Sequence, residues 1–251
     1  VLFSFIFVTI FALFYFNKSL IENIKTISFS SWKLIFYVGF FGSAIAILFR
    51  FFGLIQATGT FATLGQIVTT SQTAILAMIF LKEKLTTKFW ILFLVIIIAM
   101  YFVSVGNFHI QSLQRGDIYI LIGTFFVAIA NIISKQVLSK ISPIVLTLGR
   151  FFVASIFLFL VTLFLFRNDV LFSFSIWSVL SGLFWGINVL AFNFAIQKLG
   201  VTLTTSLLMV APVYTMILEY FLLKQSFNPI QIGAAIIVVI SGVLIVLLKD
   251  K

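Results

Sequence analysis

Residues 195–223 read AIQKLGVTLTTSLLMVAPVYTMILEYFLL, and residues 54–81 read LIQATGTFATLGQIVTTSQTAILAMIFL. Near the start of each stretch is a Gln-x-x-Gly signal, Gln197/Gly200 and Gln56/Gly59. Each then has a run of small and polar residues, an apolar stretch, a short polar break and another apolar segment. The copies are 141 residues apart at the signal and 142 residues apart further on. Such duplication predicts two repeated halves, an arrangement that many membrane carriers have.

The composition indicates an all-α polytopic membrane protein. Of the 251 residues, 63% are hydrophobic and only 9% are charged, which leaves too little polar surface for a soluble domain of this length. A membrane-spanning helix needs about 20 mostly apolar residues, and the apolar runs are too long and too little alternating for strands. Nine segments fit: 1–16, 34–55, 60–81, 89–105, 117–138, 144–166, 177–197, 201–223 and 230–248. The longest stretch between them is 17–33.

A comparison of the two copies predicts that the first copy is truncated at its N-terminus. When the end of segment 144–166 is aligned with the end of segment 1–16, Phe151 falls on Val1. One whole helix and the start of the next are therefore expected to precede the sequence. The expected architecture is two inverted repeats of five helices, with the first helix missing and nine helices covered. The expected repeats are residues 1–105 and 117–251.

The basic residues predict the orientation of the helices. The net charge is +10, but the lysines lie in short loops rather than in a patch with stacking aromatics, so nucleic acid is not an expected partner. With 17–33 in the cytoplasm, eleven basic residues lie on that side and three on the other. The eleven are Lys18, Lys25, Lys33, Lys82, Lys84, Lys88, Lys135, Lys140, Lys198, Lys249 and Lys251. This bias predicts a multi-pass protein of the inner (plasma) membrane with a cytoplasmic C-terminus.

Several kinds of functional site are excluded by the residues present. The chain has no cysteine and one histidine, so neither a disulfide nor a metal site is expected. It contains no phosphate-binding loop and no His-Glu-x-x-His motif, and no pair of carboxylates suggests hydrolysis. We therefore expect neither an enzyme nor a bound cofactor.

Polar side chains at equivalent positions of two segments predict a substrate-binding stripe. A charge in the middle of a membrane costs roughly 2.5–3.5 kcal/mol, so polar groups there normally face a cavity or a partner. In segment 60–81 the stripe consists of Thr63, Gln66, Thr70 and Thr73, at helical spacing. In segment 201–223 the equivalent stripe is Thr205, Leu208, Pro212, Thr215 and Glu219. The alternative is that these groups form hydrogen bonds across packed helices.

A third segment, 177–197, adds two candidate substrate-binding residues. Trp185 and Asn188 lie on one side of it and offer stacking and amide hydrogen bonds. Gly182 and Gly186 lie on another side, where they permit close helix packing.

Pro212 and Glu219 of the second stripe have further predicted roles. Pro212 removes one helical hydrogen bond and predicts a bend within the membrane. This bend is either a gate or a static kink. Glu219 lies near the predicted outer end of its helix, where it reaches the interface or, if it faces the cavity, binds a proton or a substrate ammonium group.

The order of short motifs resembles a known family. The second half contains Arg150-Phe-Phe-Val-Ala154, Ala195-Ile-Gln-Lys-Leu-Gly200, Ala211-Pro212-Val213-Tyr214 and Ser241-Gly242-Val243. The first half contains Leu81-Lys82-Glu83-Lys84-Leu85. Together these resemble the EamA-type repeat of the drug/metabolite transporter superfamily, in which the last motif reads Leu-Gly-Glu-x-Leu. The resemblance implies a ten-helix carrier, often an exporter of amino acids or related metabolites. Arg150 and Glu83 match repeated motif positions, and we expect structural roles for both.

These observations predict a secondary carrier that works by alternating access on a small organic solute. The lipid bilayer is the expected surrounding, and the expected cavity is formed by segments 34–55, 60–81, 177–197 and 201–223. Proton coupling, exchange and facilitated diffusion all fit the sequence, and so does a homo-oligomer. The alternative is a non-transporting membrane subunit or a lipid-handling protein with the same fold. A cavity lined only by apolar side chains and open to lipid would favour that alternative.

Overall fold

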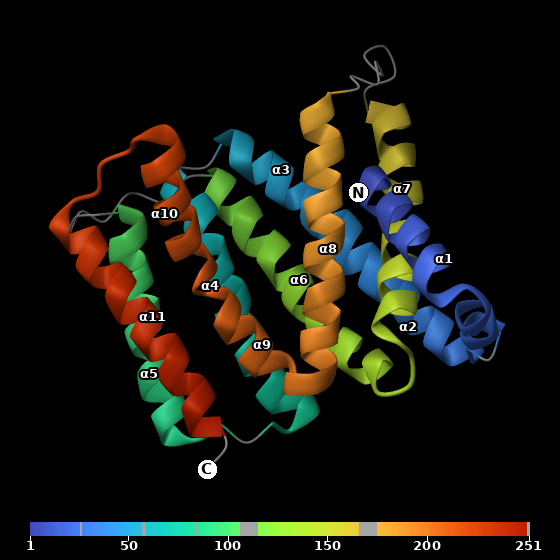
Figure 1. Cartoon of the computed structure of the whole chain (residues 1–251), viewed down its shortest axis with the longest axis horizontal. Helices are drawn as coiled ribbons and strands as arrows, with labels where there is room; N and C mark the ends of the chain where they lie inside the picture. The colour runs from blue at the N-terminus through green and yellow to red at the C-terminus, as the bar shows by residue number, and fades with distance from the viewer. Residues whose placement is uncertain (26, 57–58, 84, 106–114, 166–174, 250–251) are drawn as a thin grey trace. The chain divides into compact units, whose positions relative to one another are not determined.

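The computed structural model describes the chain except for residues 26, 57–58, 84, 106–114, 166–174 and 250–251. The regular elements of the described residues are all helices (Figure 1). In chain order these are α1 (Leu2–Lys25), α2 (Phe29–Gly39), η1 (Phe40–Ile45), α3 (Ala46–Gln56), α4 (Gly59–Leu76), η2 (Ala77–Leu81), α5 (Thr87–Val105), α6 (Arg115–Leu138), α7 (Pro143–Leu165), α8 (Ile176–Leu199), α9 (Val201–Leu208), α10 (Ala211–Leu223) and α11 (Pro229–Lys249).

These elements form nine helical segments in the described part of the chain, which confirms the predicted all-α membrane class. Five segments are long and apolar enough to cross a membrane, and four shorter ones are also apolar. The long ones are Phe29–Gln56, Arg115–Leu138, Pro143–Leu165, Ile176–Leu199 and Val201–Leu223.

One predicted boundary is wrong. The stretch 17–33 was expected to lie between helices, but α1 continues to Lys25. No glycine or proline occurs in α1 to stop it. The next helix starts after Ser28, whose side chain caps it by accepting a hydrogen bond from the backbone N–H of Ser31 at 3.3 Å.

Two of the nine segments contain a π-helical stretch, and a third is broken. The segments η1 and η2 are π-helical, with α2 and α3 flanking η1. The break separates α9 from α10 at residues 209 and 210. Pro212 lies in the first turn of α10, directly after this break.

The chain forms two compact units, and each unit takes helices from both predicted repeats. Unit 1 consists of Val1–Leu48 and Ile129–Gly200, and unit 2 of Phe49–Ala128 and Val201–Lys251. In unit 1, α7 packs against α1, α2 and α8. Glycines permit close approaches in this unit. A Cβ atom on Gly149 of α7 would lie 2.4 Å from Ile35 of α2, and one on Gly182 of α8 would lie 2.4 Å from Phe3 of α1.

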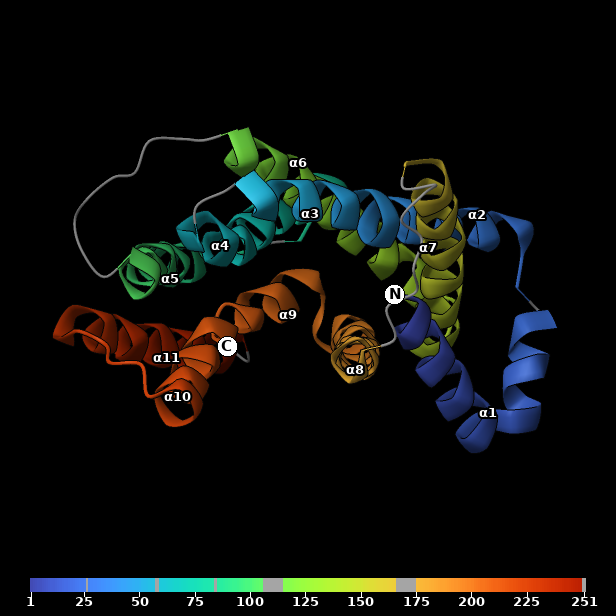
Figure 2. The same ribbon diagram turned by 90° about the horizontal axis from the view of Figure 1, so that it is seen from above.

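In unit 2, α5 and α11 lie side by side (Figures 1 and 2), and α4 packs against α9. The buried core between these helices includes Ile96, Met100 and Val238. The start of α11 has a capping box, in which Asn228 and Gln231 each accept a hydrogen bond from the backbone N–H of the other. Gln231 also donates to the carbonyl of Val103 at 3.2 Å, which joins α11 to α5.

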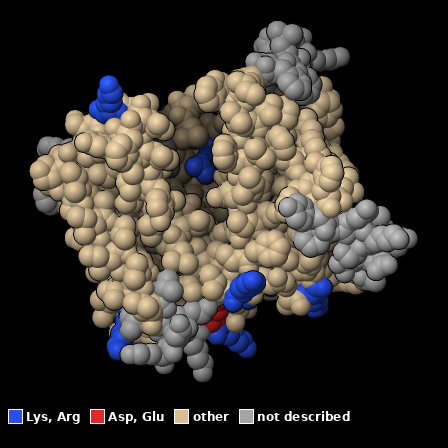
Figure 3. All heavy atoms as spheres, viewed as in Figure 1, with Lys and Arg blue, Asp and Glu red and all other residues tan. Residues whose placement is uncertain are grey.

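The outer surface is largely uncharged. On the face shown in Figure 3, atoms of Lys, Arg, Asp and Glu form only a few separate spots. Many large apolar side chains are exposed, among them Phe14, Phe164, Phe221 and Leu222. An apolar exterior of this extent is the surface that a lipid bilayer surrounds.

Candidate functional site

Six of the eight predicted site residues lie in unit 2 and two in unit 1. Gln66, Thr70 and Thr73 are on α4, and Pro212, Thr215 and Glu219 are on α10. Trp185 and Asn188 are on α8 in unit 1. The predicted cavity, which combines residues of both units, stays a prediction.

The threonines of the α4 stripe are buried and bonded to backbone carbonyls. The hydroxyl of Thr70 lies 3.0 Å from the carbonyl of Gln66 and 3.1 Å from that of Thr205 on α9. Thr73 donates to Thr69 at 2.7 Å. Gln66 is only partly buried. Thr70 thus joins two packed helices, which is the alternative role that the sequence allowed for this stripe. The side chain of Thr63 lies outside the described residues.

The second stripe is divided by the break between α9 and α10. Backbone N–H groups at the break bond three residues back: Met209 to Ser206 at 3.1 Å, and Val210 to Leu207 at 3.2 Å. Pro212 has no N–H to give to the carbonyl four residues before it. Residues 201–206 of α9 are all buried, whereas Val213 is the buried residue of α10. Residues of α10 are therefore far more accessible than those of α9.

The candidate site residues of α10 share this accessibility. The exposed hydroxyl of Thr215 bonds within its own helix, to the carbonyl of Ala211 at 3.4 Å. Glu219 and Pro212 are partly buried. These side chains are at least partly exposed, in contrast to the buried Thr70 and Thr73.

In unit 1, α8 has the two-sided character that its sequence predicts. Trp185 is 38% exposed, and Asn188 is exposed as well. Gly182 and Gly186 are buried and approach α1, where a Cβ atom on either glycine would lie 3.3 Å from the backbone of Ser4. Asn193, one turn beyond Val189, is buried and donates to the hydroxyl of Thr147 at 2.9 Å.

Sequence reasoning missed a pair of reciprocal polar contacts at the ends of α6 and α8. Lys135 Nζ donates to the carbonyl of Ile196 at 3.1 Å, and Gln197 Nε2 donates to the carbonyl of Leu138 at 2.9 Å. These side chains give a carbonyl near the C-terminus of each helix a donor from the other helix. The carbonyl of Ile196 also accepts a hydrogen bond from the backbone N–H of Gly200 at 3.1 Å. The Gln-x-x-Gly signal was visible in the sequence, and Gly200 supplies a positive φ of 90° at the end of α8.

The two charged motif residues contact other helices. Glu83 follows η2 and accepts a hydrogen bond from Thr202, at the start of α9, at 2.6 Å. Arg150, on α7, donates to Ser43 and Gly42 in η1. Both contacts agree with the structural roles expected for these residues. The described residues contain no group of His, Asp and Glu that could hold a metal ion.

Comparison with known proteins identifies the family. The model of the EamA-like transporter family matches residues 1–105 and 114–248, nearly the whole chain. The chain belongs to the EamA-like transporter family. This protein is therefore a multi-pass membrane transporter of the drug/metabolite transporter superfamily, whose members have an inverted-repeat helical fold.

A solved structure has the same fold. It is described only as "Crystal structure of protein" and superimposes with a TM-score of 0.76 over 98% of this chain and 85% of that chain. The two sequences are 17% identical, so the likeness concerns the fold alone. No curated protein matches this chain.

Proposed function

We propose that this EamA-family protein exports a small organic metabolite, such as an amino acid or a related compound, by alternating access. The proposal places it in the inner (plasma) membrane with its C-terminus in the cytoplasm. The observation that carries it is the broken helix of α9 and α10 in a chain that belongs to a transporter family. Discontinuous membrane helices commonly line the substrate path of carriers, because their ends offer free backbone groups.

The candidate site residues suit an uncharged or zwitterionic solute. Gln66 and Asn188 offer amide donors and acceptors, Thr215 offers a hydroxyl and Trp185 a stacking surface. Glu219 offers a carboxylate for a substrate ammonium group or a transported proton. A ring of carboxylates of the kind that selects inorganic ions does not occur among the described residues.

An efflux experiment tests this function. Cells that produce the protein are compared with otherwise identical cells that do not produce it. We expect one or a few amino acids or related metabolites to accumulate outside only the first cells, as measured by mass spectrometry of the medium. Identical media from the two strains, across a broad panel of metabolites, would contradict the export proposal.

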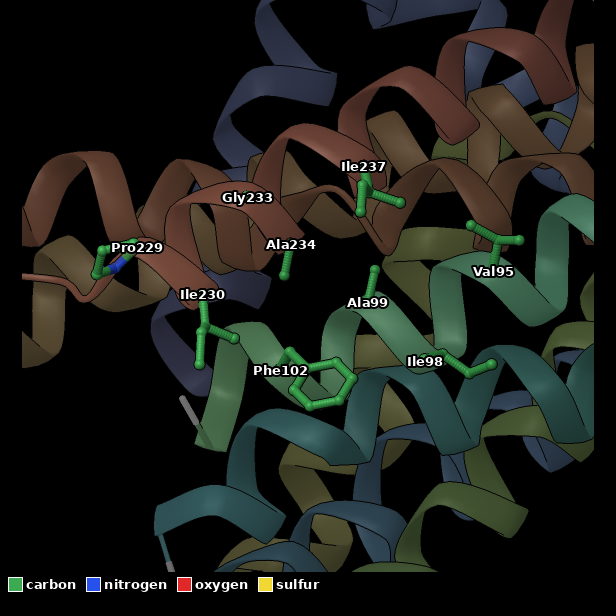
Figure 4. A pocket seen from close by; sticks show the side chains of 9 residues that line it. All are labelled: Val95, Ile98, Ala99, Phe102, Pro229, Ile230, Gly233, Ala234 and Ile237. Carbon is green, nitrogen blue, oxygen red and sulfur yellow. The ribbon is translucent and has the colours of Figure 1, made fainter. Parts of the chain in front are cut away.

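A second candidate function is lipid handling, and one observation favours it. An open groove of about 410 Å³ in unit 2 is lined only by apolar residues of α5 and α11 (Figure 4). They are Val95, Ile98, Ala99, Phe102, Pro229, Ile230, Gly233, Ala234 and Ile237. Several of these side chains are exposed, including Ile98 and Ile230. The groove therefore fits an acyl chain better than a polar solute.

The substitution Gly233→Leu separates the two candidates. A Cβ atom on Gly233 would have no neighbour within 4 Å, so a larger side chain occupies the groove without disturbing the core. If the protein is a metabolite exporter, efflux stays unchanged in this variant. If it handles lipid, crosslinking of a photoactivatable phospholipid to the groove falls in the variant, and metabolite efflux is absent from both proteins.

A further inference from the structure

The π-helical segment η1 leaves one backbone carbonyl without its usual donor. In an α-helix the N–H of Ala46 would bond to the carbonyl of Gly42, four residues earlier. Here it bonds instead to the carbonyl of Phe41, five residues earlier. The carbonyl of Gly42 has thus lost its α-helical partner at the junction of η1 with α3. A buried carbonyl without a donor costs about 1–3 kcal/mol.

Arg150 supplies a donor to this carbonyl. Its Nη2 atom lies 3.0 Å from the oxygen of Gly42, and its Nε atom donates to the hydroxyl of Ser43. The side chain is buried, with 4% exposed. Both partners are neutral, so this is not a salt bridge between helices. It is a charge-assisted hydrogen bond to a backbone acceptor, which is stronger than a bond between neutral groups.

Small residues bring the guanidinium to this position. A Cβ atom on Gly39 would lie 2.8 Å from the backbone oxygen of Arg150, so α2 and α7 touch through their main chains. A Cβ atom on Gly42 would lie 2.4 Å from Ala130 and 3.2 Å from the guanidinium. Larger residues at these glycines would push η1 away from α7 and out of reach of Arg150.

We propose that Arg150 stands in for the missing backbone amide and thereby holds the segment Phe40–Ile45 in its π-helical form. A π-helical segment contains one residue more than the α-helix that would connect the same flanks. If η1 changed to α-helix without losing a residue, the residues after Ile45 would turn by about 100° around the helix axis. Arg150 is therefore a positioning residue, since it decides which side chains of α3 face the interior. This inference does not depend on the exported solute.

A deletion provides the specific test. Deletion of Phe41 removes the acceptor that the N–H of Ala46 now uses and the extra residue of the π-helical segment. The N–H of Ala46 can then bond to the carbonyl of Gly42 in an uninterrupted α-helix, and both flanks keep their orientation. In the native chain we expect Arg150→Met to lower the melting temperature in detergent by roughly 5 °C or more. In the Phe41 deletion background, the same substitution should lower it by less than half as much, because the carbonyl no longer needs the guanidinium.

A second arginine serves as the control for the loss of a positive charge. Arg50, on α3, is exposed and comes eight residues after Gly42, so Arg50→Met should have the same small effect in both backgrounds. Folding of Arg150→Met only in the deletion background would support the proposal. An equal loss of stability from Arg150→Met in both backgrounds would overturn it. A deletion variant that no longer folds would also overturn it, because the extra residue would then be needed for another reason.

A second measurement uses the absence of cysteine from the native sequence. Single cysteines at residues 30–39 and 46–56 carry a nitroxide label, and the accessibility of each label to oxygen marks the lipid-facing side of the helix. In Arg150→Met we expect the pattern over 46–56 to move by about one position, a turn of roughly 100°, while that over 30–39 stays in place. In Arg150→Lys, which keeps a donor, both patterns should stay. An unmoved pattern in folded Arg150→Met would refute the positioning role.

Discussion

At the scale of single residues, Lys82 and Lys224 adopt the same left-handed backbone conformation, with φ of 55° and 53°. They are 142 residues apart, the spacing of the internal duplication. At each position, the backbone N–H groups of two successive residues donate to the same carbonyl of the preceding helix. Residues 82 and 83 donate to Ala77, and residues 224 and 225 donate to Glu219. Both repeats therefore end this helix with the same turn.

Glycine at these two positions should stabilise the protein. A side chain in the left-handed region costs roughly 1–2 kcal/mol, and glycine avoids that cost but loses more conformational entropy on folding. We expect Lys82→Gly and Lys224→Gly each to raise stability by up to about 1 kcal/mol, measured by thermal unfolding in detergent. Lys88→Gly, in the first turn of the right-handed helix α5, is the matched control and should lower stability by less than the roughly 1 kcal/mol that glycine costs in a helix interior. Destabilisation by all three substitutions would contradict this account.

The candidate substrate-binding residues give a second residue-scale prediction. Gln66→Leu or Asn188→Leu should reduce the apparent affinity for the solute several-fold, because a lost hydrogen bond is worth roughly 0.5–1.5 kcal/mol. Membrane insertion should be intact, since leucine suits the bilayer. Transport at varied solute concentration and surface abundance are measured on the same variants. Unchanged affinity at both positions would remove them from the site, and lower yield alone would indicate a packing role.

At the scale of elements, the segment Val201–Leu223 consists of two half-helices with different surroundings. The first, α9, is buried. Two hydrogen bonds join it to the first repeat: the hydroxyl of Thr202 donates to Glu83, and the carbonyl of Thr205 accepts from Thr70. The second, α10, exposes most of its residues. The equivalent segment of the first repeat has Thr70 in place of Pro212, and α4 is unbroken there. The break therefore coincides with a proline that the first repeat lacks at the equivalent position.

Removal of this proline should affect transport. Pro212→Ala restores an N–H for the carbonyl of Leu208, so α9 and α10 should become one helix. We expect a higher melting temperature together with slower efflux, because proline disfavours a helix interior by about 3 kcal/mol. Pro229→Ala, in the first turn of α11, is the control and should change neither, since proline is tolerated there. Normal efflux in a stabilised Pro212→Ala protein would mean that the break is a static kink.

The contact of Glu83 with Thr202 gives a second prediction for the elements. In a double-mutant cycle of Glu83→Ala and Thr202→Val, we expect a coupling energy at the lower end of roughly 1.5–3 kcal/mol, because the carboxylate is only partly buried. Lys88→Ala combined with Thr202→Val should be additive. If the effects of Glu83→Ala and Thr202→Val were also additive, the hydrogen bond between these residues would not stabilise the packing of α9.

At the scale of the whole molecule, the distribution of basic residues predicts the topology. Loop 82–88 and Lys251 are expected in the cytoplasm, and Ser226 is expected on the opposite side. Because the sequence has no cysteine, single cysteines at Thr86, Ser226 and Lys251 can be labelled cleanly. A membrane-impermeant maleimide applied to intact cells should label only the cysteine at position 226. Labelling of the other two from outside would reverse the orientation. Lys251 lies outside the described residues.

Apolar runs of membrane-spanning length and the repeated motif order were enough to predict the membrane class, the nine segments and the transporter family. These properties are local, because a stretch of about 20 apolar residues forms a helix in lipid whatever its neighbours are. The ends of helices were less predictable. Outside the apolar core, propensity decides where a helix stops, and α1 runs on through 17–25 without a breaker.

The tertiary structure decided which residues act together. The bond from Arg150 to Gly42 joins residues 108 positions apart, and neither motif position nor composition indicates its partner. The π-helical form of η1, the hydroxyl contact of Thr70 with α9 and the mixing of both repeats within each unit also depend on such distant contacts. A pattern of apolar residues records that a face is buried but not what covers it, so these features emerge only when the helices pack.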